Sequence, residues 1–137
     1  MIDYQRALAQ AVAGGRGAVP GVRDADVATF AEIALRKRLA ALHALLPRTL
    51  AALGRAAFDA RCRAFVRTRA SVGPDGYRDE AIAFARALGT AAARREARVV
   101  AAYGPRASLA IVRDGRRVTV LARLRRGARL RVVQVVR

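Results

Sequence analysis

SLAIVRDGRRVTVLARL, residues 108–124, is the stretch that decides the fold class of this chain. Asp114 and Gly115 stand between two runs rich in β-branched residues, and an Asp-Gly pair in that position is a strong signal for a β-hairpin. In the second run, one set of alternate residues is nearly all apolar, and it consists of Val118, Val120, Ala122 and Leu124. The other set is mixed, so the predicted strand has one apolar face and one mixed face.

The strand pattern continues toward the C-terminus. A short link, RRGAR at residues 125–129, leads into a further run, LRVVQVVR at residues 130–137. These segments predict a three-stranded antiparallel meander, with a fourth strand if RVVAAYG, residues 98–104, joins it. Because the apolar spacing changes near residue 94, we expect a helical domain over residues 1–93 and a basic antiparallel β-unit over residues 94–137.

Upstream of residue 94 the apolar residues repeat with helical spacing. The longest stripe consists of Leu35, Leu39, Leu42 and Leu46, and Pro47 interrupts it. A second stripe contains Phe58, Cys62 and Phe65, and a third contains Ala81, Phe84, Ala85 and Leu88. SVGPDG, residues 71–76, predicts a turn between the last two. The fold class is therefore α+β, with an N-terminal bundle of four or five helices followed by a small antiparallel β-meander.

The net charge is extreme for a chain of 137 residues. Lys and Arg number 27 and Asp and Glu number 10, which gives +17, and Lys37 is the only lysine. Residues 94–137 are the more basic part, with 13 basic and 2 acidic side chains. Such a field attracts polyanions or acidic protein partners without selecting among them. An alanine- and arginine-rich composition also arises in a GC-rich genome without selection for binding.

Signals for catalysis are weak. Cys62 lies on the apolar stripe with the two phenylalanines, where a small buried hydrophobe is the simpler interpretation than a nucleophile. His43 flanks the leucine stripe, and no second His or Cys completes a zinc site. No glycine pattern resembles a phosphate-binding loop. We therefore expect no catalytic residue, metal or cofactor, and a chain that is not an enzyme by itself.

The N-terminal residues and the single cysteine bear on location. MIDYQRALAQAVAGG lacks the basic segment and apolar run of a secretory signal, and charges interrupt every apolar stretch before it reaches membrane-spanning length. One cysteine forms no internal disulfide, which is typical of a reducing compartment. The expectation is a cytoplasmic protein without a membrane partner.

Binding residues are easier to nominate. Arg61, Arg63, Arg67 and Arg69 are candidates for a basic ridge that contacts phosphates. Arg129 and Arg131 lie beside the last predicted strand, whose free edge can accept an extended peptide through main-chain hydrogen bonds. The same arginines can instead be gatekeepers that protect an edge strand from aggregation. The sequence shows no spacing typical of a helix-turn-helix motif and no aromatic stacking pair on the predicted strands. Sequence-specific reading of nucleic acid is therefore not indicated.

The stretch from Leu46 to Leu88 resembles a known family. A Leu-Pro pair is followed seven residues later by Leu53-Gly54, and then by Phe58, Phe65, a short turn and the positions of Tyr77, Phe84 and Leu88. This pattern is similar to the N-terminal helical domain of the HvfC/BufC family, long labelled a DNA-binding domain. The resemblance implies a helical domain followed by a β-domain, in a non-catalytic partner of an iron-dependent barrel oxidase that modifies a ribosomally made peptide.

In that family the accessory subunit helps to capture the leader of the precursor peptide, and the partner enzyme holds the metal. The resemblance therefore predicts an interaction protein that binds a metal-dependent enzyme and a precursor peptide. The free edge of the last predicted strand adds that the peptide binds by β-strand addition. The alternative is a nucleic-acid-binding protein that uses an arginine-rich surface.

Overall fold

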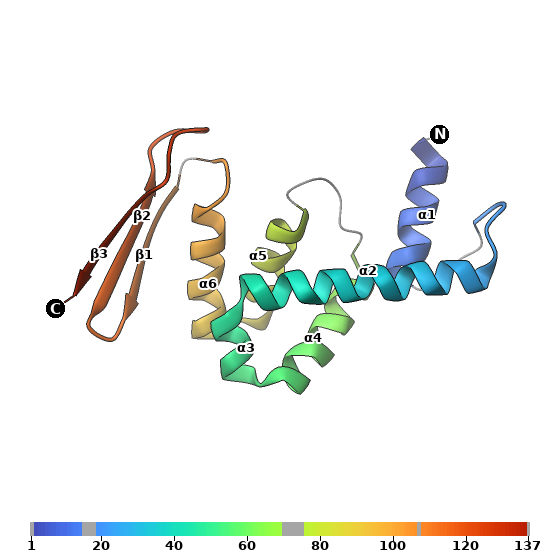
Figure 1. The fold of residues 1–137 in the computed structure, drawn as a ribbon, viewed down its shortest axis with the longest axis horizontal. Helices are drawn as coiled ribbons and strands as arrows, with labels where there is room; N and C mark the ends of the chain where they lie inside the picture. The colour runs from blue at the N-terminus through green and yellow to red at the C-terminus, as the bar shows by residue number, and fades with distance from the viewer. Residues whose placement is uncertain (1, 15–18, 70–75, 107, 137) are drawn as a thin grey trace. The chain divides into compact units, whose positions relative to one another are not determined.

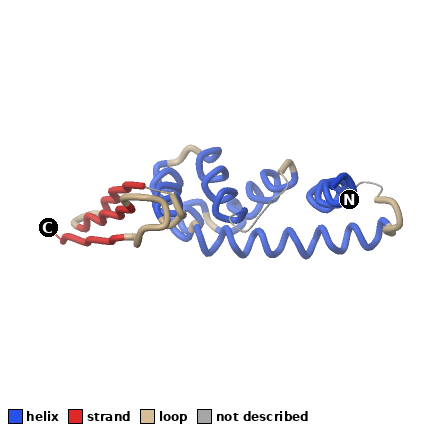
Figure 2. The backbone as a smooth tube through the Cα atoms, turned by 90° about the horizontal axis from the view of Figure 1, so that it is seen from above, coloured by secondary structure: helices blue, strands red, loops and turns tan. Residues whose placement is uncertain are grey.

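The computed structural model describes residues 2–14, 19–69, 76–106 and 108–136, and within them six helices precede three strands (Figure 1). This order confirms the α+β class and the C-terminal antiparallel meander (Figure 2), whereas the described helices number six instead of four or five. The chain divides into two compact units, Met1–Tyr77 and Arg78–Arg137. The boundary predicted between residues 93 and 94 falls inside a helix, α6, Ala91–Ala102.

The first unit is helical. Its elements are α1 (Ile2–Gly14), α2 (Asp24–Leu45), α3 (Pro47–Leu53) and α4 (Arg55–Arg67). Pro47 is in the first turn of α3, where its missing N–H breaks no helical hydrogen bond. Gly54 separates α3 from α4 with a φ of 78°, a conformation that a residue with a Cβ rarely adopts. Pro47 and Gly54 therefore each mark the end of one helix and the start of the next.

The core of this unit follows the predicted stripes with one shift. Leu39, Leu42 and Leu46 are buried, and Leu35 is half-buried. On α4 the buried residues are Phe58, Cys62 and Val66, while Phe65 is half-buried. Helix α2 packs on both α3 and α4. A separate cluster of Ala11, Val19 and Val27 joins α1 to the start of α2.

The second unit contains α5, α6 and the sheet. Helix α5 (Gly76–Leu88) begins at the unit boundary, and residues 71–75 of the predicted turn lie outside the described residues. Gly89, with a φ of 66°, ends α5, and the Thr90 hydroxyl then accepts a hydrogen bond of 3.2 Å from the N–H of Ala93 at the start of α6. Because α6 extends to Ala102, residues 98–104 do not add the fourth strand that the sequence left open.

The sheet has three strands in the order β1 (Ser108–Asp114), β2 (Arg117–Arg123) and β3 (Arg131–Val136), with both pairings antiparallel. Asp114 pairs with Arg117, so the first hairpin has a two-residue loop. Gly115 is the first loop residue, with a φ of 56°, as in a type II′ turn. The predicted Asp-Gly turn is thus confirmed, with glycine at the position that needs a positive φ.

The two faces of the sheet differ in their cover. On the inner face, Ala110, Val112 and Leu121 are buried in one cluster with Ala102 of α6. The outer face, as we name it, consists of the residues that alternate with these. Its apolar members are Leu109, Ile111, Val118, Val120, Ala122, Val133 and Val135, and Arg113 and Arg131 complete it. The apolar set of alternate residues recognised in the sequence therefore lies on the outer face, and α6 covers the mixed set.

Candidate functional site

The four arginines of the predicted helical ridge are all exposed, but they do not form one row. Arg63 and Arg67 are one turn apart on α4 and share a side of the helix. Arg61 is two residues before Arg63, which is roughly 200° around the helix. The guanidinium of Arg69, beyond the end of α4, lies 5.2 Å from the centre of the Phe65 ring, in cation–π contact. The structure brings together only Arg63 and Arg67 of this set.

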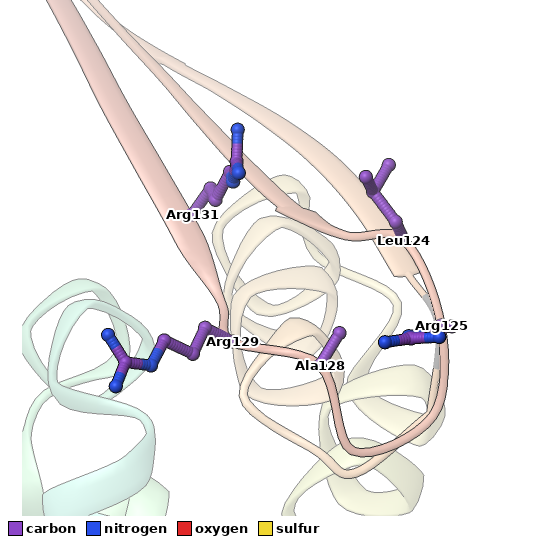
Figure 3. Close-up of a pocket in the computed structure, with 5 residues that line it drawn as sticks. All are labelled: Leu124, Arg125, Ala128, Arg129 and Arg131. Atoms are coloured by element: carbon purple, nitrogen blue, oxygen red, sulfur yellow. The ribbon is translucent and has the colours of Figure 1, made fainter.

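Of the other two predicted arginines, Arg131 is the first residue of β3 and Arg129 lies two residues before it. Arg129 and Arg131 line an open hollow of about 290 Å³ together with Leu124, Arg125 and Ala128. In Figure 3 the side chains of Arg125 and Arg129, on the loop, and of Arg131, on β3, extend in different directions. The hollow therefore suits several separate contacts to an extended acidic ligand better than a single phosphate held by converging guanidinium groups.

Main-chain contacts hold the loop that carries these arginines. The N–H of Gly127 donates a 3.1 Å hydrogen bond to the carbonyl of Pro105, and the guanidinium of Arg123 donates a 2.5 Å bond to the carbonyl of Ala128. Gly127 has a φ of 75°. These contacts fix the backbone of the loop while Arg125, Arg126 and Arg129 remain exposed, so three positive charges are presented on a defined segment.

Cys62 and His43, the two residues with potentially reactive side chains, pack within the helical unit. Cys62 is fully buried on α4. His43 Nε2 lies 2.5 Å from Asp59 Oδ1, which joins α2 to α4, and its ring centre lies 5.4 Å from that of Phe58. In the part of the chain that the structure describes, no group of three or more His, Cys, Asp or Glu side chains is placed to hold a metal ion. Sequence reasoning missed Asp59 because a partner 16 residues away on another helix leaves no local pattern.

The His43–Asp59 pair is expected to stabilise the helical unit measurably. Its side chains are 20% and 27% exposed, so the loss of either partner leaves a half-buried polar group, at a cost of about 1–2 kcal/mol. The Arg36–Glu32 pair, at 76% and 47% exposure, is the matched control, and Glu32→Ala is expected to cost less than about 0.5 kcal/mol. Urea unfolding of His43→Ala, Asp59→Ala and the double variant measures the coupling, and strictly additive losses would contradict it.

The free edge of the sheet, which the sequence nominates as a peptide-binding surface, is formed by β3. All six side chains of β3 are exposed, and β3 is paired only with β2 in the sheet as described. Val132 and Val136 point to one face of the strand and Val133 and Val135 to the other, with exposures between 47% and 70%. The strand therefore presents main-chain groups at its edge and apolar side chains on both faces.

Comparison with protein-family models, with curated proteins and with solved structures gave no match for this chain. Among the described helices, none has the length and apolar character needed to cross a membrane.

Proposed function

We propose that this protein is a non-catalytic interaction protein whose C-terminal sheet binds an extended acidic peptide as a fourth strand beside β3. The observation that carries the proposal is the exposed β3 edge. Pairing with β2 runs without interruption from Arg131 to Val136, so the backbone of β3 is already in the extended conformation that an added strand needs. An incoming strand would cover valines on both faces of β3 as well as its unpaired main-chain groups.

The alternative interpretation, that arginines only protect this edge, fits β3 less well. Proteins protect edge strands with charged residues, prolines or bulges along the strand itself. In β3 only the first residue, Arg131, is charged, and the following five described residues are Val132 to Val136 with one glutamine, Gln134. The described register contains no bulge. The positive charge lies at one end of the edge, where it favours an acidic ligand without blocking the strand.

The resemblance to the HvfC/BufC family gives the proposal a context. It suggests that the peptide is the leader of a ribosomally made precursor, that the helical unit Met1–Tyr77 docks a metal-dependent enzyme, and that the complex acts in the cytoplasm. Residues 108–137 supply the electrostatic component, because they contain nine arginines and one acidic residue, Asp114. Opposite charges speed the encounter and orient the peptide.

Fluorescence anisotropy with a labelled ten-residue peptide that alternates valine and glutamate tests this proposal. The expected result is saturable binding that is lost when the same peptide carries N-methyl groups on alternate backbone nitrogens, because strand addition needs those donors. The Arg129→Glu, Arg131→Glu variant is expected to bind about tenfold more weakly, equivalent to about 1.4 kcal/mol. Arg63→Glu, Arg67→Glu is the matched control with the same change of charge on α4. Equal binding of the N-methylated peptide would overturn strand addition.

Nucleic-acid binding is the second candidate, favoured by the net charge of +17 and by the exposed arginines of α4 and of residues 125–131. The divergence of Arg61 from Arg63 argues for phosphate contacts without base reading. In this case a labelled 20-base-pair duplex would bind with an affinity that falls steeply between about 50 and 200 mM salt. The Arg63→Glu, Arg67→Glu variant would then lose affinity for the duplex. No duplex binding at 50 mM salt would remove this candidate.

A further inference from the structure

The outer face of the sheet is a second surface without cover, distinct from the β3 edge. Leu109 is 69% exposed and Ile111 is 58% exposed on β1, and Val133 and Val135 are 56% and 49% exposed on β3. The β2 residues between them, Val118 and Val120, are half-buried. Because Ile111 pairs with Val120, and Val120 with Val133, these side chains form a continuous band across all three strands. Folded monomers rarely leave such a band open unless it binds something.

The inner face shows what this sheet accepts. There a helix of 12 residues, α6, packs on β1 and β2 and buries Ala110, Val112 and Leu121. The outer face has the same dimensions, about 10 Å across three strands and about 20 Å along them. An α-helix of three to four turns, with a diameter of about 10 Å, matches that area. On β1, the outer residues Leu109 and Ile111 are also larger than the inner residues Ala110 and Val112 that α6 covers.

The charges around the outer face indicate the chemistry of the partner. Arg113 pairs with Val118 and Arg131 pairs with Ala122, so both arginines belong to this face, and they lie at diagonally opposite corners. Arg113 is next to the first hairpin, and Arg131 begins the last strand. The outer face of a second copy would bring two more arginines and no carboxylate to pair with these two. A helix with carboxylates near both ends would instead meet an arginine at each end.

We propose that the outer face is the docking site for an amphipathic helix of another protein, with a stripe of leucine-like residues and acidic residues at both ends. The apolar stripe covers Leu109, Ile111 and Val133, and the acidic ends lie beside Arg113 and Arg131. This arrangement places the sheet between two helices, with α6 on one side and the partner on the other. The helix contacts side chains across the whole face, whereas strand addition uses the main-chain groups of the β3 edge. Arg131 and Val133 belong to both surfaces, but Leu109 and Ile111 lie on β1, away from that edge.

A synthetic helix tests the proposal on the full chain. The probe is a labelled 14-residue peptide, about four helical turns, with leucines at helical spacing and glutamates in its first and last turns. Its control has glutamine in place of every leucine. Titration calorimetry is expected to show binding of the leucine peptide and at least tenfold weaker binding of the glutamine peptide. Leu109→Ser, Ile111→Ser is expected to weaken binding of the leucine peptide at least tenfold. Phe30→Ser, at a side chain of similar exposure on α2, is expected to leave it unchanged.

Three results would overturn the proposal. Equal affinity of the Leu109→Ser, Ile111→Ser variant for the leucine peptide would show that the outer face is not the site. Sedimentation equilibrium with a dimer that this double variant abolishes would assign the face to a second copy. Binding of phosphatidylserine vesicles through the same residues, without binding of the helix, would assign it to a membrane surface. The Leu109→Ser, Ile111→Ser variant is expected to bind the valine–glutamate peptide as the unmodified protein does. Failure of helix docking can therefore be told apart from failure of strand addition at β3.

Discussion

Phe58→Ala is expected to destabilise the helical unit by about 3–5 kcal/mol, which is close to the whole stability of a small domain. The Phe58 side chain is fully buried on α4, and its ring packs beside that of His43. Removal of the ring leaves a cavity between elements that are tied together by the His43–Asp59 contact and cannot collapse freely. Urea unfolding followed by circular dichroism measures the loss of stability. A variant that is already unfolded without urea has lost at least the whole stability of the unit.

Phe65→Ala is the matched control on the same helix. The two phenylalanines look equivalent in the sequence. If both were core residues, replacement of either by alanine would lower the stability by the same amount. In the structure Phe65 is half-buried and its exposed surface carries the guanidinium of Arg69. We therefore expect a loss of roughly half that of Phe58→Ala or less, because transfer from water scales with buried area. Equal losses for the two variants would contradict the burial described for α4.

Leu121→Ala is expected to destabilise the sheet by about 2–5 kcal/mol. Leu121 is 2% exposed, lies on the central strand and packs with Ala102, Ala110 and Val112. Its neighbours are small, so no other side chain can fill the space that it leaves. Hydrogen exchange of the backbone amides in β2 reports the effect directly, since their protection depends on this strand remaining between β1 and β3.

Val133→Ala, on the exposed outer face of the same sheet, provides the control and is expected to change the stability by less than about 0.5 kcal/mol. The two substitutions remove apolar atoms from neighbouring strands, but only Leu121 faces α6. Faster amide hydrogen exchange in β2 after Val133→Ala than after Leu121→Ala would contradict this assignment. It would mean that Val133, and not Leu121, lies on the covered face of the sheet.

Much of the fold could be predicted because it depends on local signals. Pro47, Gly54 and the Asp114-Gly115 pair each impose a backbone geometry that few alternatives satisfy, and the structure turns at all three. The leucine stripe of α2 also has the spacing of one helix face, and its last three members are buried. Signals of this kind act within a few residues, so a single sequence contains them in full.

The sixth helix was missed because Val99 and Val100 favour strands and stand next to a β-rich segment. Tertiary packing overrides that preference, since Val100 is buried on α6 and Val99 packs against the sheet cluster. A usable signal was present in Gly89 and Thr90, a glycine that ends one helix and a threonine that caps the next. The choice of sheet face had no such signal, because it depends on which side an alanine-rich helix approaches.

The candidate sites divide in the same way. Helix geometry alone separates Arg61 from Arg63, so the predicted ridge could have been reduced to Arg63 and Arg67 from the sequence. The positions of Arg129 and Arg131 at one end of an exposed strand follow from the meander prediction. The contact of His43 with Asp59 and the open outer face depend on the packing of separate elements, which periodicity does not specify.

The exposed β3 edge also has a consequence for how the chain behaves in concentrated solution. Two copies can pair edge to edge through β3, and repulsion between molecules of charge +17 opposes that encounter. Counter-ions shorten the range of this repulsion to about 8 Å at physiological ionic strength and to about 3 Å in 1 M salt. The arginines thus act as a colloidal stabiliser whose strength is set by the surrounding electrolyte. An acidic ligand that neutralises them removes this repulsion, so it keeps the chains apart only if it also occupies the β3 edge.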